Sequence, residues 1–489
     1  MQDEEKGLLI LQMPGCVPWQ QKHEVEAALG VALLKQIANR AIAIQPPLVH
    51  SIGITRIWEN ELMRFVRFST RGRRLKQLAT GFVAVLLPAI LSVANTLSGQ
   101  TRYDLLLKGG HVIDGKNNIN AIRDLAITGG KISALAPNID PSLARKIVDV
   151  SGLWVTPGLI DIHEHVYTYA AQQSSQADDQ GFTPDGFAFR AGVTTVVDAG
   201  SSGWRTFEDF KTRVIDRSRT RVLALLNIVG WGKRGDKFVQ DLDDMDAKPT
   251  SEMALKHKGV VVGIKCADFK GPEWKSYEQA VEAGRIADVP VMIDFGANRT
   301  ERPLYDLLTR VLRPGDIYTH VYWGLMGEQD EQTGGPSKAL IEGRKRGVIF
   351  DVGHGNGVFA FSLAVPLMKV GFVPDSFSTD VHLNSSTNMN VAMNDILEVM
   401  SEFLAMGMPL DSAIMRATWN PAKEIKHQEL GNLSAGSPAD VAVLRLENGK
   451  FSFVDRRRGS LDGTQRLVCE LTIRDGKVVY DMKGIARER

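Results

Sequence analysis

Histidines, carboxylates and one lysine stand at the ends of apolar segments along this 489-residue chain. The first of these segments ends in His163-Glu164-His165. Alternate residues of a strand point the same way, so both imidazoles would face one centre. Later segments end in further candidate ligands, which are Lys265, Asp294, His320 and Asp380. Imidazole and carboxylate ligands of this kind are typical of hydrolytic zinc sites, so the pattern predicts a metal centre.

Each of these residues has a structural alternative when it is taken alone. A single His-x-His pair is common by chance, and His320 could be a core histidine with ordinary hydrogen-bond partners. Asp380 could cap a helix, and Lys265 could pair with a structural acid. Because they recur at corresponding ends of successive segments, metal binding explains them better than four separate structural roles.

The segments that carry these residues have the pattern of buried strands that alternate with helices. Eight apolar runs follow Trp154, namely GLIDIHEH, GVTTVVDAG, RVLALLNIVG, GVVVGIKCA, VPVMIDFG, GDIYTH, GVIFDVGHG and DSFSTDVH. Between two of them, KSYEQAVEAGRIAD places Ala280, Val281, Gly284 and Ala287 on one helical face. This α/β alternation predicts a (β/α)8 TIM barrel, whose active site lies at the carboxyl ends of the strands.

Shorter β segments flank the expected barrel on both sides. Residues 103–137 alternate apolar and polar side chains between Gly-Gly and Asp-Gly turns. The last 60 residues return to short strands with one Asn-Gly and two Asp-Gly turns. We therefore expect a small β-sandwich domain built from both chain ends, residues 100–155 and 432–489, beside a hydrolase barrel at 156–431.

The overall composition is that of an ordinary globular protein. Hydrophobic residues make up 44% and charged residues 24% of the chain, which is enough for a large core. The 58 basic and 57 acidic residues nearly cancel, so no nucleic-acid partner is expected. The three cysteines form neither a disulfide framework nor a CxxC metal motif.

The segment that starts at Met63 has the order of a secretory signal. Basic residues are followed by an apolar run from Leu78 to Ala94 that ends in small residues. We expect a signal peptide over 63–99 and a periplasmic or secreted protein, and an uncleaved membrane anchor is the alternative. Residues 1–62 show little pattern, and we interpret them as a gene-model extension or a disordered segment.

Several motifs, in the same order along the chain, resemble the amidohydrolase superfamily. They are TPGLIDIHEHVY, RAGVTTVVDAGSSGW, VVGIK, GDIYTH, FDVGHGNGVFAF, FSTDVH and GNLSAGSPADVAVL. The resemblance extends from about Tyr103 to Tyr480 and is greatest to the deacetylase-like metallohydrolases, often labelled dihydroorotase-like. It implies a binuclear divalent site, with zinc as the expected metal, in a (β/α)8 barrel beside a β-sandwich.

The resemblance also implies a role for each candidate ligand. His163 and His165 would hold the more buried metal together with Asp380. Lys265, N-carboxylated by CO2, would bridge two divalent ions, and His320 would bind the second. Two ions that share a water would lower its pKa and generate hydroxide, while Asp380 accepts the proton and passes it to the leaving group. The implied reaction is hydrolysis of an amide or ester carbonyl in a small acylated compound.

Asp294 departs from the resembled pattern, because the fifth strand of the family normally ends in a histidine that binds the second metal. A carboxylate there lowers the charge of a two-metal site from about +1 to about zero. It also favours harder ions such as Mn²⁺ over Zn²⁺. Alternatively, the shorter side chain does not reach, which would leave a mononuclear or weakly occupied second site.

Three functions remain open from the sequence. The first is a metal-dependent deacetylase, the second a cyclic-amide hydrolase of the dihydroorotase or hydantoinase kind, and the third a degenerate homologue without turnover. A serine hydrolase is not indicated, because AGSSGW is not a GxSxG elbow.

His354 and His382 lie beside the expected site and fit a pocket role or a structural role equally well. A small acylated compound is the expected partner, an oligomer is allowed, and a membrane is involved only through an uncleaved signal.

Overall fold

The computed structural model describes residues 102–167, 183–355, 357–382, 393–455 and 457–487. The expected extension at 1–62 and the expected signal peptide at 63–99 lie outside these described residues. Within the described ranges, no helix combines the length and the apolar character needed to cross a membrane.

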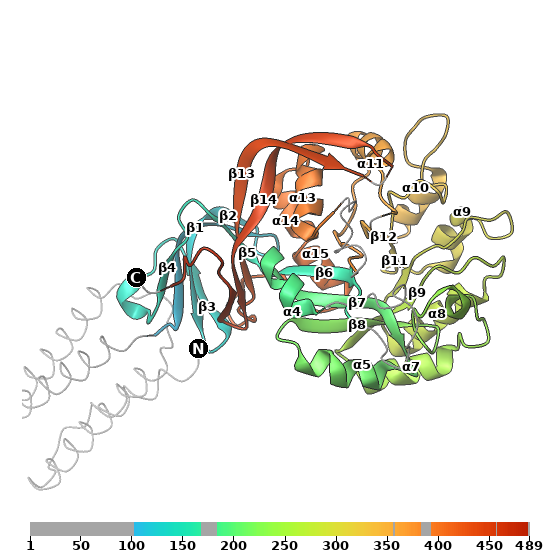
Figure 1. Cartoon of the computed structure of the whole chain (residues 1–489), viewed down its shortest axis with the longest axis horizontal. Helices are drawn as coiled ribbons and strands as arrows, with labels where there is room; N and C mark the ends of the chain where they lie inside the picture. Colours follow the sequence, from blue (N-terminus) through green and yellow to red (C-terminus); the bar gives the residue numbers. More distant parts are fainter. Residues whose placement is uncertain (1–101, 168–182, 356, 383–392, 456, 488–489) are drawn as a thin grey trace, which may run out of the picture. The chain divides into compact units, whose positions relative to one another are not determined.

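A curled parallel sheet of seven strands occupies the middle of the chain (Figure 1). Its strands are β6 (Leu159–Glu164), β7 (Val193–Gly203), β8 (Arg221–Asn227), β9 (Val261–Cys266), β10 (Val291–Ile293), β11 (Ile317–Tyr318) and β12 (Ile349–Phe350). Each strand pairs with the next one along the chain. Every residue of β6, β7 and β9 is buried, as expected for parallel strands that are covered on both faces. Seven of the eight predicted apolar runs are therefore confirmed as strands.

The eighth predicted run, residues 375–382, forms isolated bridges rather than a regular strand. Val381 makes a parallel bridge to Glu164 in β6, and Ser376 makes one to Asp351 just after β12. This segment therefore contacts both edges of the seven-stranded sheet.

Helices follow most of the parallel strands and cover the outer side of the sheet. They are α4 (Pro184–Phe187), α5 (Phe207–Arg213), α6 (Asp236–Val239), α7 (Ala247–Lys256), α8 (Lys275–Ala287), α9 (Leu304–Asp306), α10 (Lys338–Lys345), α11 (Phe361–Lys369), α13 (Ile396–Ala405), α14 (Leu410–Arg416) and α15 (Trp419–Glu424). The predicted helix at 275–288 is confirmed as α8, with Ala280, Gly284 and Ala287 buried and Val281 at the edge of that face. Figure 1 shows α5 and α7 beneath β7 and β8.

A separate mixed sheet combines strands from both flanks of the parallel sheet. The first flank gives β1 (Leu105–Asp114), β2 (Ile119–Thr128), β3 (Lys131–Ala136), β4 (Ile147–Asp149) and β5 (Trp154–Pro157), and the second gives β13 (Val441–Val454), β14 (Ser460–Arg474) and β15 (Lys477–Tyr480). The order is β15-β14-β13-β5-β1-β2-β3, with β4 paired to β1. The antiparallel pairing of β13 with β5 joins the two flanks.

Two of the three turns predicted near the carboxyl end are wrong. Asn448-Gly449 lies inside β13 at a break in register, and Asp462-Gly463 lies inside β14. A Cβ on Gly463 would come within 2.8 Å of the Phe453 ring and 3.1 Å of Ala405, so this glycine permits close packing instead of a turn. Only Asp475-Gly476 connects two strands. The result is a long hairpin of 14- and 15-residue strands that arches over α13 (Figure 1).

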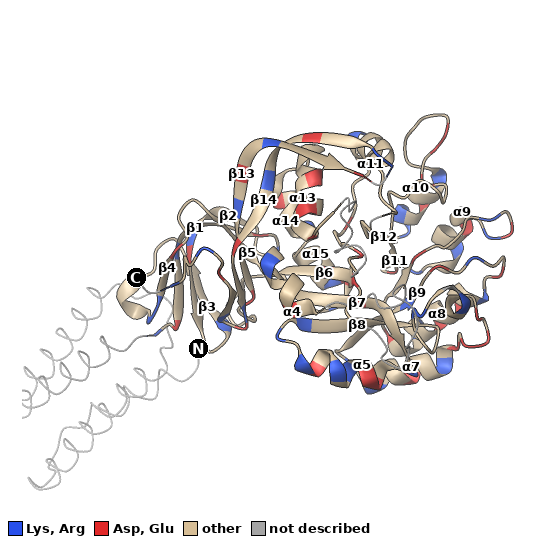
Figure 2. Cartoon of the chain, viewed as in Figure 1, with Lys and Arg blue, Asp and Glu red and all other residues tan. Residues whose placement is uncertain are grey.

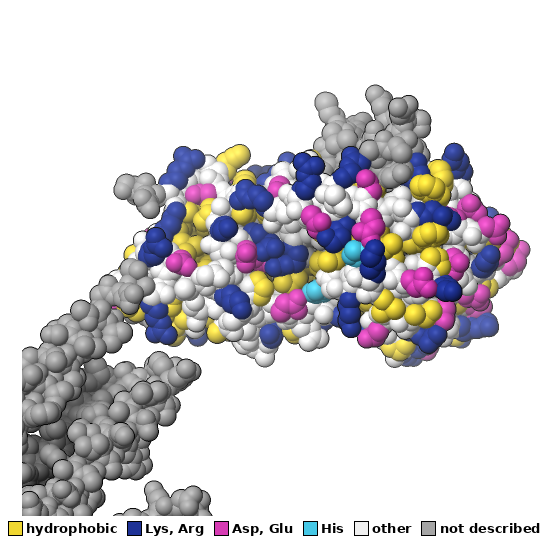
Figure 3. Space-filling view, turned by 90° about the horizontal axis from the view of Figure 1, so that it is seen from below, with side chains coloured by type: hydrophobic (Ala, Val, Ile, Leu, Met, Phe, Trp, Pro, Cys, Tyr) yellow, Lys and Arg dark blue, Asp and Glu magenta, His cyan; other side chains and the backbone are white. Residues whose placement is uncertain are grey.

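Charged side chains of both signs are interspersed on the described surface. Figure 2 shows basic and acidic residues side by side on α5 and α7, where Lys256 and Glu208 form an ion pair of 2.5 Å. The face in Figure 3 likewise mixes basic, acidic and apolar side chains. Neither view shows an extended region of a single charge.

Candidate metal centre

The six predicted ligands lie at the carboxyl ends of the parallel strands or just beyond them. His163 is in β6 and Lys265 in β9, whereas Asp294 follows β10 and His320 lies two residues after β11. His165 follows β6, and Asp380 belongs to the bridging segment. Five of the six are buried, and the side chain of Asp380 is 14% exposed. The fold therefore brings the six side chains to one end of the sheet.

Three of them form a cluster with the spacing of metal ligands. The ligand atoms of His163, His165 and Asp380 all lie within 4.8 Å of one another. Nε2 of His163 is 3.3 Å and Nε2 of His165 is 3.1 Å from the same Asp380 oxygen, Oδ1. Two imidazoles and a carboxylate are a common donor set for a divalent ion, so these residues fit the metal that the sequence predicted.

Hydrogen bonds fix which nitrogen of His163 faces the cluster. The hydroxyl of Thr319 donates its single hydrogen to Asp351 over 2.7 Å. It must therefore accept a hydrogen from Nδ1 of His163, which lies 3.1 Å away. The proton is thereby assigned to Nδ1, and the lone pair of Nε2 remains available on the cluster side.

The outer nitrogens of the other two histidines are held in a similar way. Nδ1 of His165 lies 2.9 Å from the hydroxyl of Ser201, whose backbone amide donates to Asp198. Nδ1 of His320 donates to the Gly353 carbonyl over 2.5 Å. Each Nε2 is thus left for an inner partner, which is the arrangement that ligating histidines require.

Lys265 is fully buried beside these ligands, which is unusual for a lysine. Its Nζ lies 3.1 Å from Nε2 of His163 and 3.5 Å from the sulfur of Met292. Burial lowers the pKa of Lys265 and so favours the neutral amine. Gly200 makes room for the side chain, since a Cβ there would lie 2.8 Å from Cβ and Cγ of Lys265.

Asp294 and His320 form a neighbouring acid–imidazole pair. Oδ2 of Asp294 is 3.4 Å from Nε2 of His320. Burial acts to raise the pKa of Asp294, but the charges of His320, Lys265 and Lys233 outweigh it and hold that pKa below its ordinary value. Burial acts to lower the pKa of His320, and Asp294 reverses the effect and raises it. The shorter aspartate thus reaches the nitrogen that was predicted to bind the second metal.

Two of these side chains sit on unfavourable backbone. His320 has a φ of +61° and Asp380 a φ of +50°, in the left-handed region that residues other than glycine rarely occupy. Such conformations persist only where surrounding contacts enforce them, and they concentrate at functional sites.

The two further histidines considered from the sequence have different surroundings. Nε2 of His354 lies 2.9 Å from Glu402 in α13, and its ring stacks on Phe359, so this side chain supports the loop and does not join the ligands. His382 lies beside His165, with 6.4 Å between ring centroids, and burial lowers its pKa to about 4.

Sequence reasoning missed the residues that hold the ligands in place. Thr319 stands directly before His320, and Asp351 directly follows β12 within the run GVIFDVGHG, so polar residues at strand ends were the available signal. Lys233 was also missed: its Nζ lies 3.2 Å from Asp268, and its backbone amide donates to Gly200. Burial acts to lower the pKa of Lys233, but the charges of Asp268, Asp380 and Asp294 raise it, so this ammonium lies in the field of the site.

Comparisons with known proteins find relatives in sequence and in fold. No protein-family model matches the chain. A curated deacetylase from Brucella anthropi is 29% identical over 369 residues, which cover 73% of this chain and 88% of the relative. A crystal structure of an adenine deaminase superposes with a TM-score of 0.70 at 26% identity, over 78% of this chain and 100% of that one. A dihydroorotase structure superposes with a TM-score of 0.66 at 24% identity, over 77% and 99%.

Proposed function

We propose that this chain is a metal-dependent hydrolase that removes an acyl group from a small compound. Its resemblance to the deacetylases of the amidohydrolase superfamily is borne out by these relatives. The bond cleaved is the carbon–nitrogen bond of an amide or the carbon–oxygen bond of an ester. The observation that carries the proposal is the convergence of two imidazole nitrogens and the Asp380 carboxylate at the carboxyl ends of parallel strands.

The finer architecture is part of the proposal. The segment with bridges to both edges of the parallel sheet would close it into a (β/α)8 barrel, and the mixed sheet would form the β-sandwich domain. Support for closure comes from the Glu164–Val381 and Asp351–Ser376 bridges at the two edges.

Two divalent ions would be held by the six side chains. His163, His165 and Asp380 would bind one ion, His320 and Asp294 the other, and N-carboxylated Lys265 both. Zinc suits the imidazoles, and Asp294 adds an oxygen ligand that also suits manganese. Such ions, when bound, polarise the substrate carbonyl and lower the pKa of a water.

Carboxylation of Lys265 would require a neutral amine close to the ligands. The nitrogen lone pair forms a bond to the carbon of CO2, and one proton leaves to solvent. Complete burial of Lys265, 3.1 Å from Nε2 of His163, supports this step. Protein equilibrated with ¹³C-labelled bicarbonate should show a carbamate carbon resonance that the Lys265→Met variant lacks.

Asp380 would act as the proton carrier of the reaction. Its Oδ1 lies against both histidines, so Oδ2 is the oxygen left to accept a proton from the attacking water. Gly355 keeps space beside that oxygen, since a Cβ there would lie 2.8 Å from Oδ2. As the carbon–nitrogen or carbon–oxygen bond breaks, the proton passes from Asp380 to the leaving atom.

A substrate panel tests the proposal against its alternatives. We expect hydrolysis of N-acetyl or O-acetyl compounds by the metal-loaded chain. Ring opening of cyclic amides without deacetylation would instead favour the hydantoinase-like alternative, which the fold shared with a dihydroorotase allows. Absence of both metal and activity in native and Asp294→His protein would leave the degenerate homologue.

The location is also a proposal. A periplasmic or secreted protein is supported by the basic and apolar segment that begins at Met63. Amino-terminal sequencing of the exported chain tests it, and a mature chain that begins before Met63 would contradict it.

A further inference from the structure

A cavity lies at the ends of the same strands opposite to the predicted metal ligands. Its volume is about 420 Å³. Its lining includes residues directly before β10 (Val289, Pro290) and β11 (Asp316), together with Ile349 at the start of β12 and one side of α15. The strands are parallel, so these residues lie at the amino ends, whereas the predicted metal ligands lie at the carboxyl ends. The cavity is therefore a separate site.

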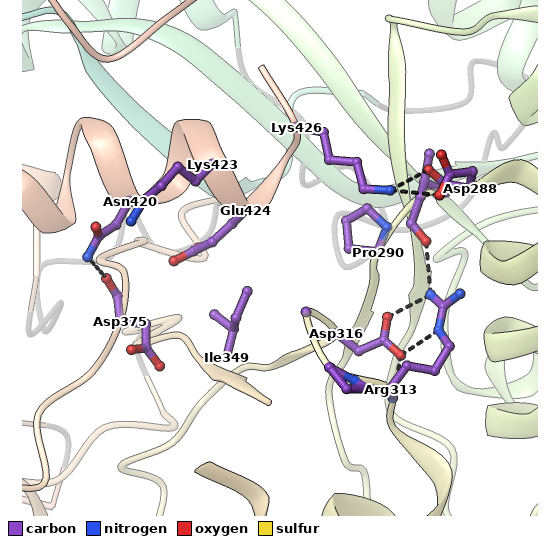
Figure 4. Close-up of a pocket in the computed structure, with 13 residues that line it drawn as sticks. Asp288, Pro290, Arg313, Asp316, Ile349, Asp375, Asn420, Lys423, Glu424 and Lys426 are labelled. Atoms are coloured by element: carbon purple, nitrogen blue, oxygen red, sulfur yellow. Dashed lines mark hydrogen bonds and ion pairs between the residues drawn. The ribbon is translucent and has the colours of Figure 1, made fainter. Parts of the chain in front are cut away.

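The charged side chains on one wall of this cavity form ion pairs with one another. Arg313 donates to both carboxylate oxygens of Asp316, and the amide of Val291 donates to the same carboxylate. Lys426 lies 2.8 Å from Asp288 on the rim. Figure 4 shows both pairs on the same side of the cavity. These charges have partners within the protein and leave little demand for a ligand.

The facing wall carries a buried carboxyl with a free oxygen. Glu424 is the last residue of α15 and is 8% exposed, and its Oε2 has no hydrogen-bond partner among the described residues. Figure 4 shows this carboxyl reaching into the open space near Asp375 and Ile349, away from the two ion pairs. A buried polar atom without a partner costs about 1–3 kcal/mol, so a hydrogen-bond donor in the cavity would relieve it.

A basic residue accompanies this carboxyl on the same helix. Lys423 is exposed at the rim, and its ammonium lies 5.9 Å from the centre of the Trp419 ring. It takes part in none of the ion pairs found in the described part of the chain. The wall formed by α15 thus offers a carboxyl with one free oxygen, Oε2 of Glu424, beside a lysine that forms no ion pair in the described chain.

We propose that this cavity binds a small zwitterion of the α-amino-acid class, with its ammonium on Glu424 and its carboxylate at Lys423. Pro290 and Ile349 supply apolar surface for the hydrocarbon part, and the volume lies in the range of about 300–1,000 Å³ usual for small-molecule sites. A simple anion would meet the carboxyls of Glu424 and Asp375, and a simple cation would meet Lys423. A zwitterion meets both groups at once, because its ammonium favours the ionised form of Glu424, which burial otherwise keeps protonated.

Calorimetric titration of the metal-loaded full chain tests this site. The probes are L-alanine and L-leucine, which carry both charges, and acetate and methylammonium, which carry one each. We expect at least one amino acid to bind about tenfold more tightly than either single-charge probe. Glu424→Gln keeps the size of the side chain and should weaken amino-acid binding at least about tenfold, corresponding to about 1.4 kcal/mol. Lys423→Met should weaken it as well, and Lys248→Met, an exposed lysine on α7, is the matched control.

The outcomes separate this site from the metal centre. Weakened binding in Glu424→Gln and Lys423→Met, with hydrolysis and metal content unchanged, supports the proposal. If Glu424→Gln does not fold, Lys423→Met decides, because that side chain is exposed. Binding that survives both substitutions and disappears on metal removal would place the amino acid at the metal centre and overturn the proposal, as would no binding by either amino acid. The binding of amino acids at this cavity does not decide whether the chain is a hydrolase, because the substrate panel tests that proposal independently.

Discussion

The two ends of the parallel strands bury charged side chains in opposite arrangements. At the carboxyl ends, His163, His165 and His320 each have an outer nitrogen held by the protein and an inner nitrogen that faces a carboxylate. At the amino ends, Arg313 and Asp316 satisfy each other within one turn of chain. Both arrangements bury polar groups, but only the first leaves several ligand atoms facing one point.

This difference distinguishes a ligand site from a structural ion pair. Buried polar groups need hydrogen-bond partners. A side chain that is held by the protein through one polar atom, while its other polar atom remains available, is typical of a ligand-binding site. Where both partners belong to the protein, the pair contributes to the fold. Glu424 is the exception at the amino ends, because its free oxygen has no protein partner in the described chain.

The largest expected effect is at the carboxyl ends. Asp380→Asn removes the proton acceptor and one anionic ligand, so kcat/KM should fall by about 10²- to 10⁴-fold or more. Hydrolysis assays with circular dichroism as a control for folding measure this. Nearly native activity in a metal-loaded Asp380→Asn protein would exclude Asp380 as the proton carrier.

Breaking the pair at the amino ends should affect stability instead. Arg313→Met leaves Asp316, which is 1% exposed, without its cation, and we expect a loss of about 3 kcal/mol in the free energy of unfolding. Urea denaturation measures the loss. Activity per bound metal should be unchanged, and a selective loss of activity in folded protein would show that the two ends are coupled.

A smaller effect, on metal affinity, should follow from removing the hydrogen-bond partner that holds the outer nitrogen of one ligating histidine. Thr319→Val removes the hydroxyl that holds Nδ1 of His163, so metal affinity should fall by about 10- to 100-fold while the fold is retained. Competition with a chelator measures the affinity. Thr212→Val, an exposed threonine on α5, is the matched control, and equal affinities in the two variants would argue against this orienting role.

The smallest effect should be a pH dependence of stability at Glu424. Burial raises the pKa of Glu424 well above its ordinary value of 4.5, because the hydrogen bond from Ser376 offsets only part of the effect. The folded state therefore binds this proton more tightly, and its stabilising effect is complete below 4.5 and is lost as the pH rises towards the raised pKa. The glutamine of the Glu424→Gln variant cannot ionise. The melting temperature of this variant should therefore rise relative to that of the native chain as the pH increases from acidic to neutral. A constant difference would show that Glu424 is not buried as a neutral acid.

Much of the parallel sheet could be predicted because continuous apolar runs mark strands covered on both faces. The eighth run, DSFSTDVH, was recognised but forms only bridges. Its Ser376 and Ser378 hydroxyls point to Asp351, so part of this segment bonds through side chains instead of a regular ladder. The long β13–β14 hairpin was missed because glycine after Asn or Asp indicates a turn, whereas Gly463 serves close packing against Phe453.

The ligands could be predicted from their position at strand ends, whereas their supports could not. Thr319 and Asp351 act on His163 across 156 residues of sequence or more, and Lys233 approaches Asp268 from a different loop. These contacts depend on how neighbouring strands align in space. Residue type and spacing within one segment carry no such information.

Metal analysis combined with hydrolysis is the most direct test of the central claim. The native chain, dialysed and analysed by mass spectrometry for its metals, should retain divalent ions and hydrolyse an acetylated compound. Strong chelation should abolish this activity, and zinc or manganese should restore it, but not in the His163→Ala variant. Hydrolysis that continues in protein free of metal would contradict the account.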